Sequence, residues 1–288
     1  MKKLNLGCGS RHREGWTNVD LTSSSHRVVS IDISRHLNFE RNSFDVVYNS
    51  HFLEHLSKEH ALRVLAECHR IMIPGAVIRC VVPDLEALVT NYLEQLQGAR
   101  ECEAGAAIRY EWSMLALIDQ VARDRPGGEM TSFLSVHDAE SLDWVFAIEG
   151  SEIKSNHNRL HAQHFPRQLT VGRTPRAASM LRRIRPTPGN LRKFLSRMID
   201  GLVAVFPKGE RKALEIGRFR LSGEVHRWMY DAYSLGRALK AAGFVDVVQR
   251  TAYDSYVSNW HQEQLDTEAD GSVYKPSSLF MEALKPCA

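Results

Sequence analysis

The chain has 288 residues, enough for one large domain or one domain with an insertion, and no apolar run approaches the length of a membrane span. A hydrophobic content of 43% and a charged content of 25% are ordinary for a globular protein and exclude a disordered or fibrous chain. The formal net charge of +3 is uneven, because thirteen Lys or Arg and three acids lie between residues 173 and 220, a basic block of +10 that predicts an anionic partner.

The first residues of the chain and its cysteines predict the cellular compartment of the protein. Residues 1–4 lead straight into an apolar strand without a signal segment, and the five cysteines form no C-x-x-C pair. We therefore expect a cytoplasmic protein whose thiols are reduced.

The first predicted strand ends in two glycines, Gly7 and Gly9, which indicate a tight turn where the backbone approaches a ligand. A second apolar stub ends in Asp20, at the strand tip where open α/β sheets hold ribose hydroxyls. A dinucleotide fingerprint needs a third glycine at the position of His12. The pattern thus favours a cofactor with adenosine and no pyrophosphate, such as S-adenosylmethionine.

A third strand, over residues 28–32, ends in a second acid. Asp32 can accept a hydrogen bond from the exocyclic amine of adenine, and Ile33 can lie against the adenine ring. The pattern then predicts a strand over 43–49, a helix over 50–73 stopped by Pro74 and Gly75, a strand over 76–82 and a helix over 85–96.

From residue 98 to 222 the alternation of strands and helices lapses, which indicates an insertion. It contains predicted helices over 103–123 and 139–148, a His- and Asn-rich loop over 156–166, a basic linker over 182–188 and a basic amphipathic helix over 190–206. That last helix packs on the protein's own core or lies on a membrane surface. The regular pattern returns with a helix over 234–242 and strands over 245–250 and 278–283.

Together these motifs resemble class I S-adenosylmethionine-dependent methyltransferases, and more narrowly the methyltransferase type 11-like branch associated with bacterial surface-polysaccharide and lipopolysaccharide biosynthesis. The motifs are L-N-L-G-C-G, G-W-T-N-V-D, S-F-D-V-V-Y, H-F-L-E-H-L, R-I-M-I-P-G, V-V-P-D-L-E and A-A-G-F-V-D-V-V. The resemblance implies an α/β fold: a Rossmann-like seven-stranded sheet with a mainly helical insertion between the fifth and sixth strands. We expect a methyltransferase domain over 1–97 and 223–288, and over 98–222 an insertion that acts as a lid or contacts substrate or membrane.

The resemblance also implies roles for residues that match its motifs. Gly7 and Gly9 would approach the methionine part of the cofactor, and Asn49 would line the cofactor cleft. Only ten residues separate Gly9 from Asp20, too few for the usual helix, so we expect a loop or single turn there. The expected cofactor-binding set is Leu6, Gly7, Cys8, Gly9, Asp20, Asp32, Ile33 and Asn49.

Polar residues after the fourth strand are the candidates for chemistry. His51, Glu54 and His55 would share one helical face, which suits a base with an orienting acid or a set of metal ligands. H-x-x-E-H is also the inverted zinc-protease signature, which belongs to a different fold. Quinone-biosynthesis O-methyltransferases, which resemble this chain here, hold a divalent metal with E-x-x-E-H, where this chain has His51 first. Glu54 and His55 could instead only cap the helix; we favour His51 as the base over a divalent-metal site.

Three further residues are candidates for binding the acceptor. Asp84, at the tip of the fifth strand, would bind a hydroxyl or simply cap the next helix. His226 and Tyr230 would face the cleft or pack where the insertion rejoins the sheet.

The expected function is methyl transfer from S-adenosylmethionine, to oxygen rather than nitrogen. The expected acceptor is a sugar or glycan hydroxyl of a surface polysaccharide or its lipid-linked precursor. The basic insertion could also contact the inner face of an anionic membrane peripherally. RNA or a small-molecule acceptor and a non-catalytic cofactor-binding scaffold remain the alternatives.

Overall fold

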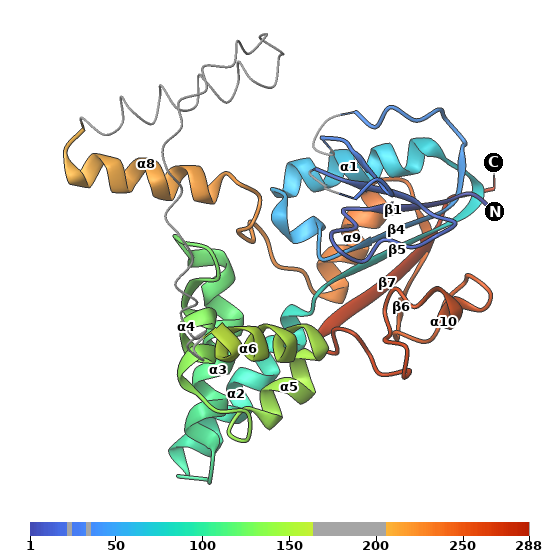
Figure 1. The fold of residues 1–288 in the computed structure, drawn as a ribbon. Coiled ribbons are helices and arrows are strands. Elements are labelled where there is room, and N and C mark those ends of the chain that lie inside the picture. Colours follow the sequence, from blue (N-terminus) through green and yellow to red (C-terminus); the bar gives the residue numbers. More distant parts are fainter. Residues whose placement is uncertain (22–24, 33–35, 164–205, 288) are drawn as a thin grey trace, which may run out of the picture.

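The computed structural model describes residues 1–21, 25–32, 36–163 and 206–287. Within these residues, seven strands form one sheet in the order β3-β2-β1-β4-β5-β7-β6, with β7 antiparallel to its two neighbours and all other pairs parallel (Figure 1). This order is that of the Rossmann-like methyltransferase fold and confirms the predicted fold class. The strands are β1 (Lys3–Leu6), β2 (Thr17–Asp20), β3 (Val28–Ser30), β4 (Phe44–Ser50), β5 (Met72–Pro83), β6 (Val245–Arg250) and β7 (Ser278–Leu284).

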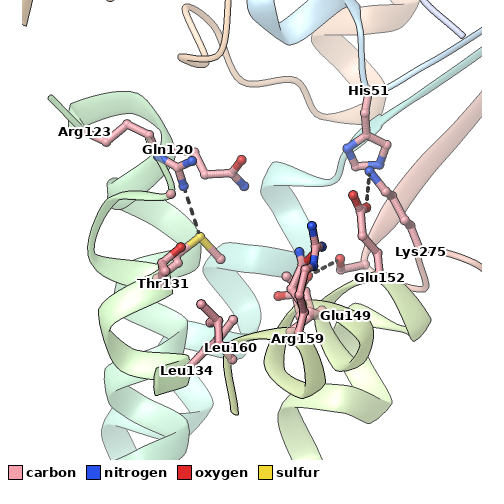
Figure 2. A pocket seen from close by; sticks show the side chains of 15 residues that line it. His51, Gln120, Arg123, Thr131, Leu134, Glu149, Glu152, Arg159, Leu160 and Lys275 are labelled. Atoms are coloured by element: carbon pink, nitrogen blue, oxygen red, sulfur yellow. Dashed lines mark hydrogen bonds and ion pairs between the residues drawn. The ribbon is translucent and has the colours of Figure 1, made fainter. Parts of the chain in front are cut away.

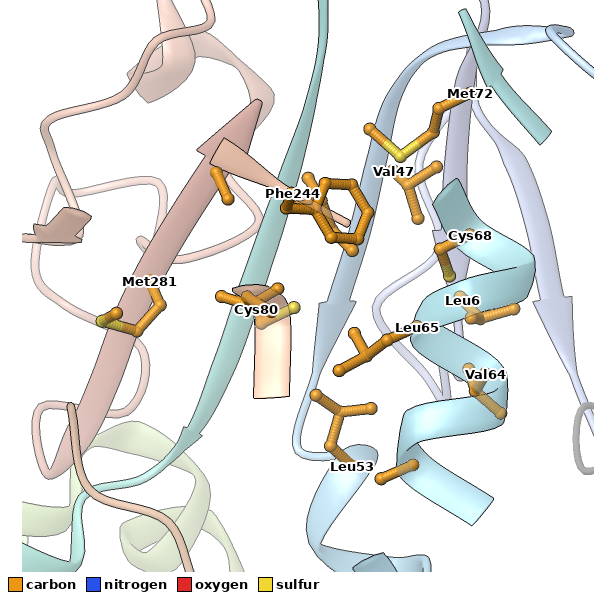
Figure 3. Close-up of a cluster of buried hydrophobic side chains, with 14 of the residues drawn as sticks. Leu6, Val47, Leu53, Val64, Leu65, Cys68, Met72, Cys80, Phe244 and Met281 are labelled. Carbon is orange, nitrogen blue, oxygen red and sulfur yellow. The ribbon is translucent and has the colours of Figure 1, made fainter. Parts of the chain in front are cut away.

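Two helices, α1 (Lys58–Ile71) and α9 (Ala232–Ala241), cover one face of the sheet (Figure 1). Leu65 and Cys68 of α1 are buried there with strand residues such as Val47, as Figure 3 shows. The central strands are buried along most of their length because helices or loops cover both faces of the sheet. This layer fixes the strand ends that carry the site.

The segment 251–277, with the short helix α10 (Trp260–Glu263), covers the opposite face. The fully buried Arg79 of β5 holds it by donating from Nε to Asp266 at 2.7 Å and from Nη1 to the carbonyl of Asp254 at 2.9 Å, and it also donates to Glu282 of β7 at 2.9 Å. Tyr48 of β4 also donates to Asp266, at 2.7 Å. The network therefore fixes the polar residues that this segment contributes to the site.

Helices beyond the carboxyl ends of the strands form a layer with a core of its own (Figure 1). That core contains the fully buried Trp112, Leu142 and Val145. The helices are α2 (Leu85–Arg100), α3 (Ala106–Ala122), α4 (Gly128–Val136), α5 (Asp143–Glu149) and α6 (Ser151–Gln163); α8 (Lys208–Arg220) follows and buries none of its residues. The separate core agrees with an insertion, although the predicted domain boundaries stay a prediction.

The helix predicted over 50–73 is wrong over its first eight residues, and its last two belong to β5, which already contains Pro74 and Gly75. β4 continues to Ser50, a single 3-10 turn η1 (Leu53–His55) follows, and α1 begins only after Ser57, whose hydroxyl accepts from the backbone N–H of His60. A serine N-cap in extended conformation starts the helix there. His51, Glu54 and His55 consequently do not share one helical face.

Other predicted elements have mixed outcomes. The crossover between β1 and β2 contains no helix, as predicted, and the helix over 103–123 is confirmed as α3. The loop over 156–166 is wrong as far as residue 163, which α6 reaches, because His157 and His161 of this helix contact backbone carbonyls at the end of α4. α5 occupies the second half of the helix predicted over 139–148, while α4 and α8 had no predicted counterpart. The basic linker over 182–188 lies outside the described residues, and so does the basic helix predicted over 190–206, except for its last residue.

Within the described ranges, no helix is both long enough and apolar enough to cross a lipid bilayer.

Candidate functional site

The turn after β1 is held by the end of β2. Gly7 and Gly9 both have positive φ, +70° and +51°, and the N–H groups of Gly7 and Cys8 donate to the carbonyl of Val19 at 2.8 and 3.1 Å. A Cβ on Gly7 would lie 2.8 Å from the ring of Phe52, whereas one on Gly9 would meet nothing within 4 Å. The turn therefore packs against Phe52 at Gly7, whereas open space adjoins it at Gly9.

Asp20 closes this turn with its carboxylate. Oδ2 accepts from the N–H of Gly9 at 2.8 Å and Oδ1 from that of Leu21 at 2.7 Å. Each oxygen keeps a lone pair for a further donor. Asp32 is exposed just beyond β3, and neither aspartate lines a described cavity. Ile33 lies outside the described residues, so the nucleoside half of the predicted cofactor site stays a prediction.

A cavity of about 160 Å³ lies beside the glycine turn. Gly7, Cys8 and Gly9 form one wall, and its volume is enough for the part of a ligand next to the turn rather than a whole cofactor. Leu6 and Asn49 point away: Leu6 is fully buried in the core, and the Asn49 side-chain amide donates to Cys80 Sγ at 3.2 Å. Residues next to them on the strands face the cavity instead because strand side chains alternate between faces. These are Asn5, Tyr48 and Ser50.

A larger cavity of about 490 Å³ lies between these strand ends and helices α3, α4 and α6 (Figure 2). Three residues, His51, Glu152 and Lys275, line both cavities. Lys275 Nζ contacts Glu152 at 2.8 Å, and although burial raises the pKa of Glu152, Lys275 outweighs it and lowers that pKa below its usual value. Burial raises the pKa of Glu149, deeper in the larger cavity, despite hydrogen bonds to it from Trp112 and Ser277. The wall shared by the two cavities therefore carries one positive charge, one negative charge and one imidazole.

His51 is held in a conformation that non-glycine residues rarely adopt. Its φ is +48°, and its N–H donates to the carbonyl of Val81 at 2.8 Å. Nε2 lies 2.9 Å from Ser278 Oγ, and Nδ1 lies 3.3 Å from Glu54 Oε1. Burial, together with nearby Lys275, lowers the pKa of His51, so the ring is neutral near pH 7. With its proton on Nδ1 facing Glu54, the ring presents the Nε2 lone pair as a proton acceptor.

Behind His51 lies a cluster of Glu54, His55 and His226. Glu54 is completely buried, and the His55 and His226 rings meet edge to face with centroids 4.8 Å apart. Burial raises the pKa of Glu54, but the contact with His51 lowers it more, below its usual value. Burial is also the main reason that the pKa of His226 falls to about 3. None of the three lines a described cavity, so the structure brings His226 to the catalytic candidates but not to the cleft.

Asp84 and Tyr230 lie at the junction of β5, α2 and α9. Asp84 is the N-cap of α2, where Oδ1 accepts from the N–H of Glu86 at 3.0 Å. Tyr230 is buried in the main core, and its carbonyl accepts from Leu85 N–H. Their part in acceptor binding stays a prediction.

Several cavity residues were missed at the sequence level. Glu152 comes from α6, and Tyr274 and Lys275 come from the irregular segment before β7. No local pattern marks them, since only the packing of α6 and segment 251–277 brings them to the glycine turn. Of the missed cavity residues, Arg11 comes closest to being marked by the sequence, because it is a basic residue just after the glycine turn. Its guanidinium lies 3.8 Å from the centre of the Tyr274 ring.

A family model described as a methyltransferase domain matches residues 11–80, and no curated protein matches the sequence. The chain is similar to solved structures of S-adenosylmethionine-dependent methyltransferases from Archaeoglobus fulgidus (24% identity, 32% of this chain and 50% of that chain covered, TM-score 0.27) and from Methanosarcina mazei (22%, 32% and 59%, TM-score 0.27). A chain in the complex with the Haloferax volcanii Trm112 methyltransferase activator is also similar (11%, 99% and 82%, TM-score 0.36).

This chain therefore spans only about half the length of the first two of these proteins. The family match and the sheet order support a class I S-adenosylmethionine-dependent methyltransferase.

Proposed function

We propose that this chain transfers the methyl group of S-adenosylmethionine to a hydroxyl of a sugar-like acceptor, such as a unit of a surface glycan or its lipid-linked precursor. The observation that carries the proposal is the wall shared by the two cavities, formed by His51, Glu152 and Lys275. A donor at the glycine turn and an acceptor in the larger cavity would meet at this wall, and holding two reactants in line is most of what methyl transfer requires.

The cofactor side of the site fits the glycine turn. Gly9 leaves open space in front of the backbone, and both Asp20 oxygens keep lone pairs for ribose hydroxyls. Bound S-adenosylmethionine would supply an electrophilic methyl group on a sulfonium. The turn and Asp20 orient that group and add no covalent chemistry of their own.

The acceptor side is large and polar enough for a sugar. Its volume of about 490 Å³ is within the range of small-molecule sites, roughly 300–1,000 Å³. Its lining combines hydrogen-bonding and apolar side chains. The polar ones include Gln120, Thr131, Asn156 and Arg159; the apolar ones include Met130 and Leu134.

His51 is the proposed general base. Its Nε2 takes the proton of the acceptor hydroxyl as the oxygen–methyl bond forms, either directly or through the hydroxyl of Ser278, and Glu54 stabilises the resulting imidazolium through Nδ1–H. The lowered pKa of His51 keeps the base neutral before the reaction. The proton leaves to solvent afterwards.

Calorimetry with S-adenosylhomocysteine tests the cofactor half. The wild-type chain should bind it, and Asp20→Ala should weaken binding by at least about tenfold, through loss of a charge-assisted contact. Asp45→Ala is the matched control because Asp45 also accepts from a backbone N–H, that of Lys2, but at the amino end of β4. A wild-type chain without measurable affinity would rule the proposal out.

Transfer of a labelled methyl group to a panel of sugars and glycan precursors tests the acceptor half. Activity on a sugar that persists at high salt would argue against RNA, since binding to phosphates weakens as salt rises. Any turnover excludes a scaffold role. His51→Ala should lower kcat by about 10²–10⁴-fold, and unchanged kcat would show that another group removes the proton.

A further inference from the structure

The cluster of Glu54, His55 and His226 is short of hydrogen-bond partners. Apart from the 3.3 Å ion-pair contact of Glu54 Oε1 with His51 Nδ1, both Glu54 carboxylate oxygens and the Nδ1 atoms of His55 and His226 are buried without a partner. Buried polar atoms are almost always paired, so four orphans in one cluster require an explanation.

Glu54 is the strongest of these anomalies. Its side chain is 0% exposed, and no Lys or Arg within the described ranges forms an ion pair with it. Its one ion-pair contact within those ranges is with the imidazole of His51, at 3.3 Å, and that ring is neutral near pH 7. An ionised carboxylate in such surroundings costs several kcal/mol unless a cation compensates it.

The backbone brings the three side chains together. The carbonyl of Glu54 accepts from the N–H groups of Arg227 and Trp228 at 2.6 and 3.1 Å, and the N–H of His226 donates to the carbonyl of Gln120 at 3.0 Å. These bonds clamp the segment returning from the helical layer onto η1. The position of His226 is therefore set independently of any ligand.

We propose that Glu54, His55 and His226 bind one divalent transition-metal ion, with Zn²⁺ the best match. Their ligand atoms all lie within 4.8 Å of one another. Ligands about 2.1 Å from a tetrahedral ion lie about 3.4 Å apart, so small side-chain rotations close the set. Two imidazoles and one carboxylate are a donor set that Zn²⁺ accepts, and a solvent molecule would complete it.

Such an ion would compensate the negative charge of Glu54. It would also link the loop after β4 to the segment before α9. His55 is only half-buried, which leaves a route for the ion from solvent. His51 does not belong to the set, although it touches Glu54 from the cleft side. The site does not depend on the proposed methyl transfer.

Metal content of the full-length, untagged chain tests the proposal. After treatment with a chelator, incubation with Zn²⁺ and desalting, mass spectrometry should find about one Zn²⁺ per chain. His226→Ala and the isosteric Glu54→Gln should lower this to background. His69→Ala is the control, because His69 also has a buried unpartnered nitrogen but packs against Phe244, and this variant should keep the wild-type content.

A second measurement needs no variant. Co²⁺ in the wild-type chain should give the intense visible absorption of a four-coordinate ion, and Zn²⁺ should displace it. Wild-type protein at background metal content, a Co²⁺ spectrum like that of the hydrated ion, or a folded His226→Ala variant with full Zn²⁺ content would each overturn the site.

Discussion

Replacement of Gly7 by alanine tests whether the loop after β4 shapes the glycine turn. A Cβ on Gly7 would lie 2.8 Å from Cδ2 and 2.9 Å from Cγ of Phe52, closer than carbon atoms pack. The left-handed conformation alone costs an alanine about 1–2 kcal/mol, and the overlap adds about 1–3 kcal/mol. Gly7→Ala should therefore lower the free energy of unfolding by about 2–5 kcal/mol.

Gly9→Ala separates the two contributions. Gly9 also has positive φ, but its Cβ would have open space, so only the conformational cost of about 1–2 kcal/mol applies. Phe52→Ala provides the reciprocal control because it removes the ring that Gly7→Ala would strike. In that background only the Cβ of residue 52 stays close, at 3.1 Å from the new Cβ, so Gly7→Ala should cost only slightly more than Gly9→Ala does.

Urea unfolding of the single variants and of the double variant gives the coupling free energy between the two positions. We expect about 1–3 kcal/mol, the overlap contribution alone. Equal costs for Gly7→Ala and Gly9→Ala in the wild-type background, or a coupling near zero, would refute the steric account of the turn.

Three further predictions concern the buried ion network around Arg79, the thiol of Cys8 in the glycine turn and the N-cap of α2. Arg79→Met removes the cation between two fully buried carboxylates, so the free energy of unfolding in urea should fall by about 3–5 kcal/mol; an unchanged midpoint would contradict a compensating role. Burial, and secondly Asp20, raise the pKa of the Cys8 thiol from 9.0 to about 11, so at pH 8 iodoacetamide should modify it about 100-fold more slowly than a thiol of ordinary pKa; mass spectrometry should find exposed Cys287 modified first, and the reverse order would count against the burial of Cys8. Asp84→Ala should cost about 1 kcal/mol of stability through loss of the α2 N-cap, and a neutral result in thermal unfolding would show that the cap contributes nothing.

Local pattern was enough to predict the sheet and its glycine turn. Residues 3–20 alone determine the short first strand, the positive-φ glycines and the acid at the end of β2, because these features depend on interactions between near neighbours. The Asp20 contact with Gly9 joins two parts of that one segment. The absence of a helix between β1 and β2 likewise follows from chain length alone.

Helix boundaries in the middle of the chain were harder to predict. The periodicity of 50–73 favoured one helix, but a serine N-cap and the left-handed His51 divide it. Residues 156–163 of α6 were predicted as a loop because they are rich in His and Asn, yet His157 and His161 contact carbonyls at the end of α4 that only the tertiary structure supplies.

The sequence by itself determined the class of fold and the position of the glycine turn, because both arise from apolar periodicity and backbone conformation within short stretches. Only the tertiary structure decided the rest of the site. It brought Glu152 and Lys275 to His51, and it placed His226 beside Glu54 and His55. These residues lie on elements far apart in the chain, and their meeting depends on how the helical layer and the C-terminal segment pack against the strand ends, which no local pattern encodes.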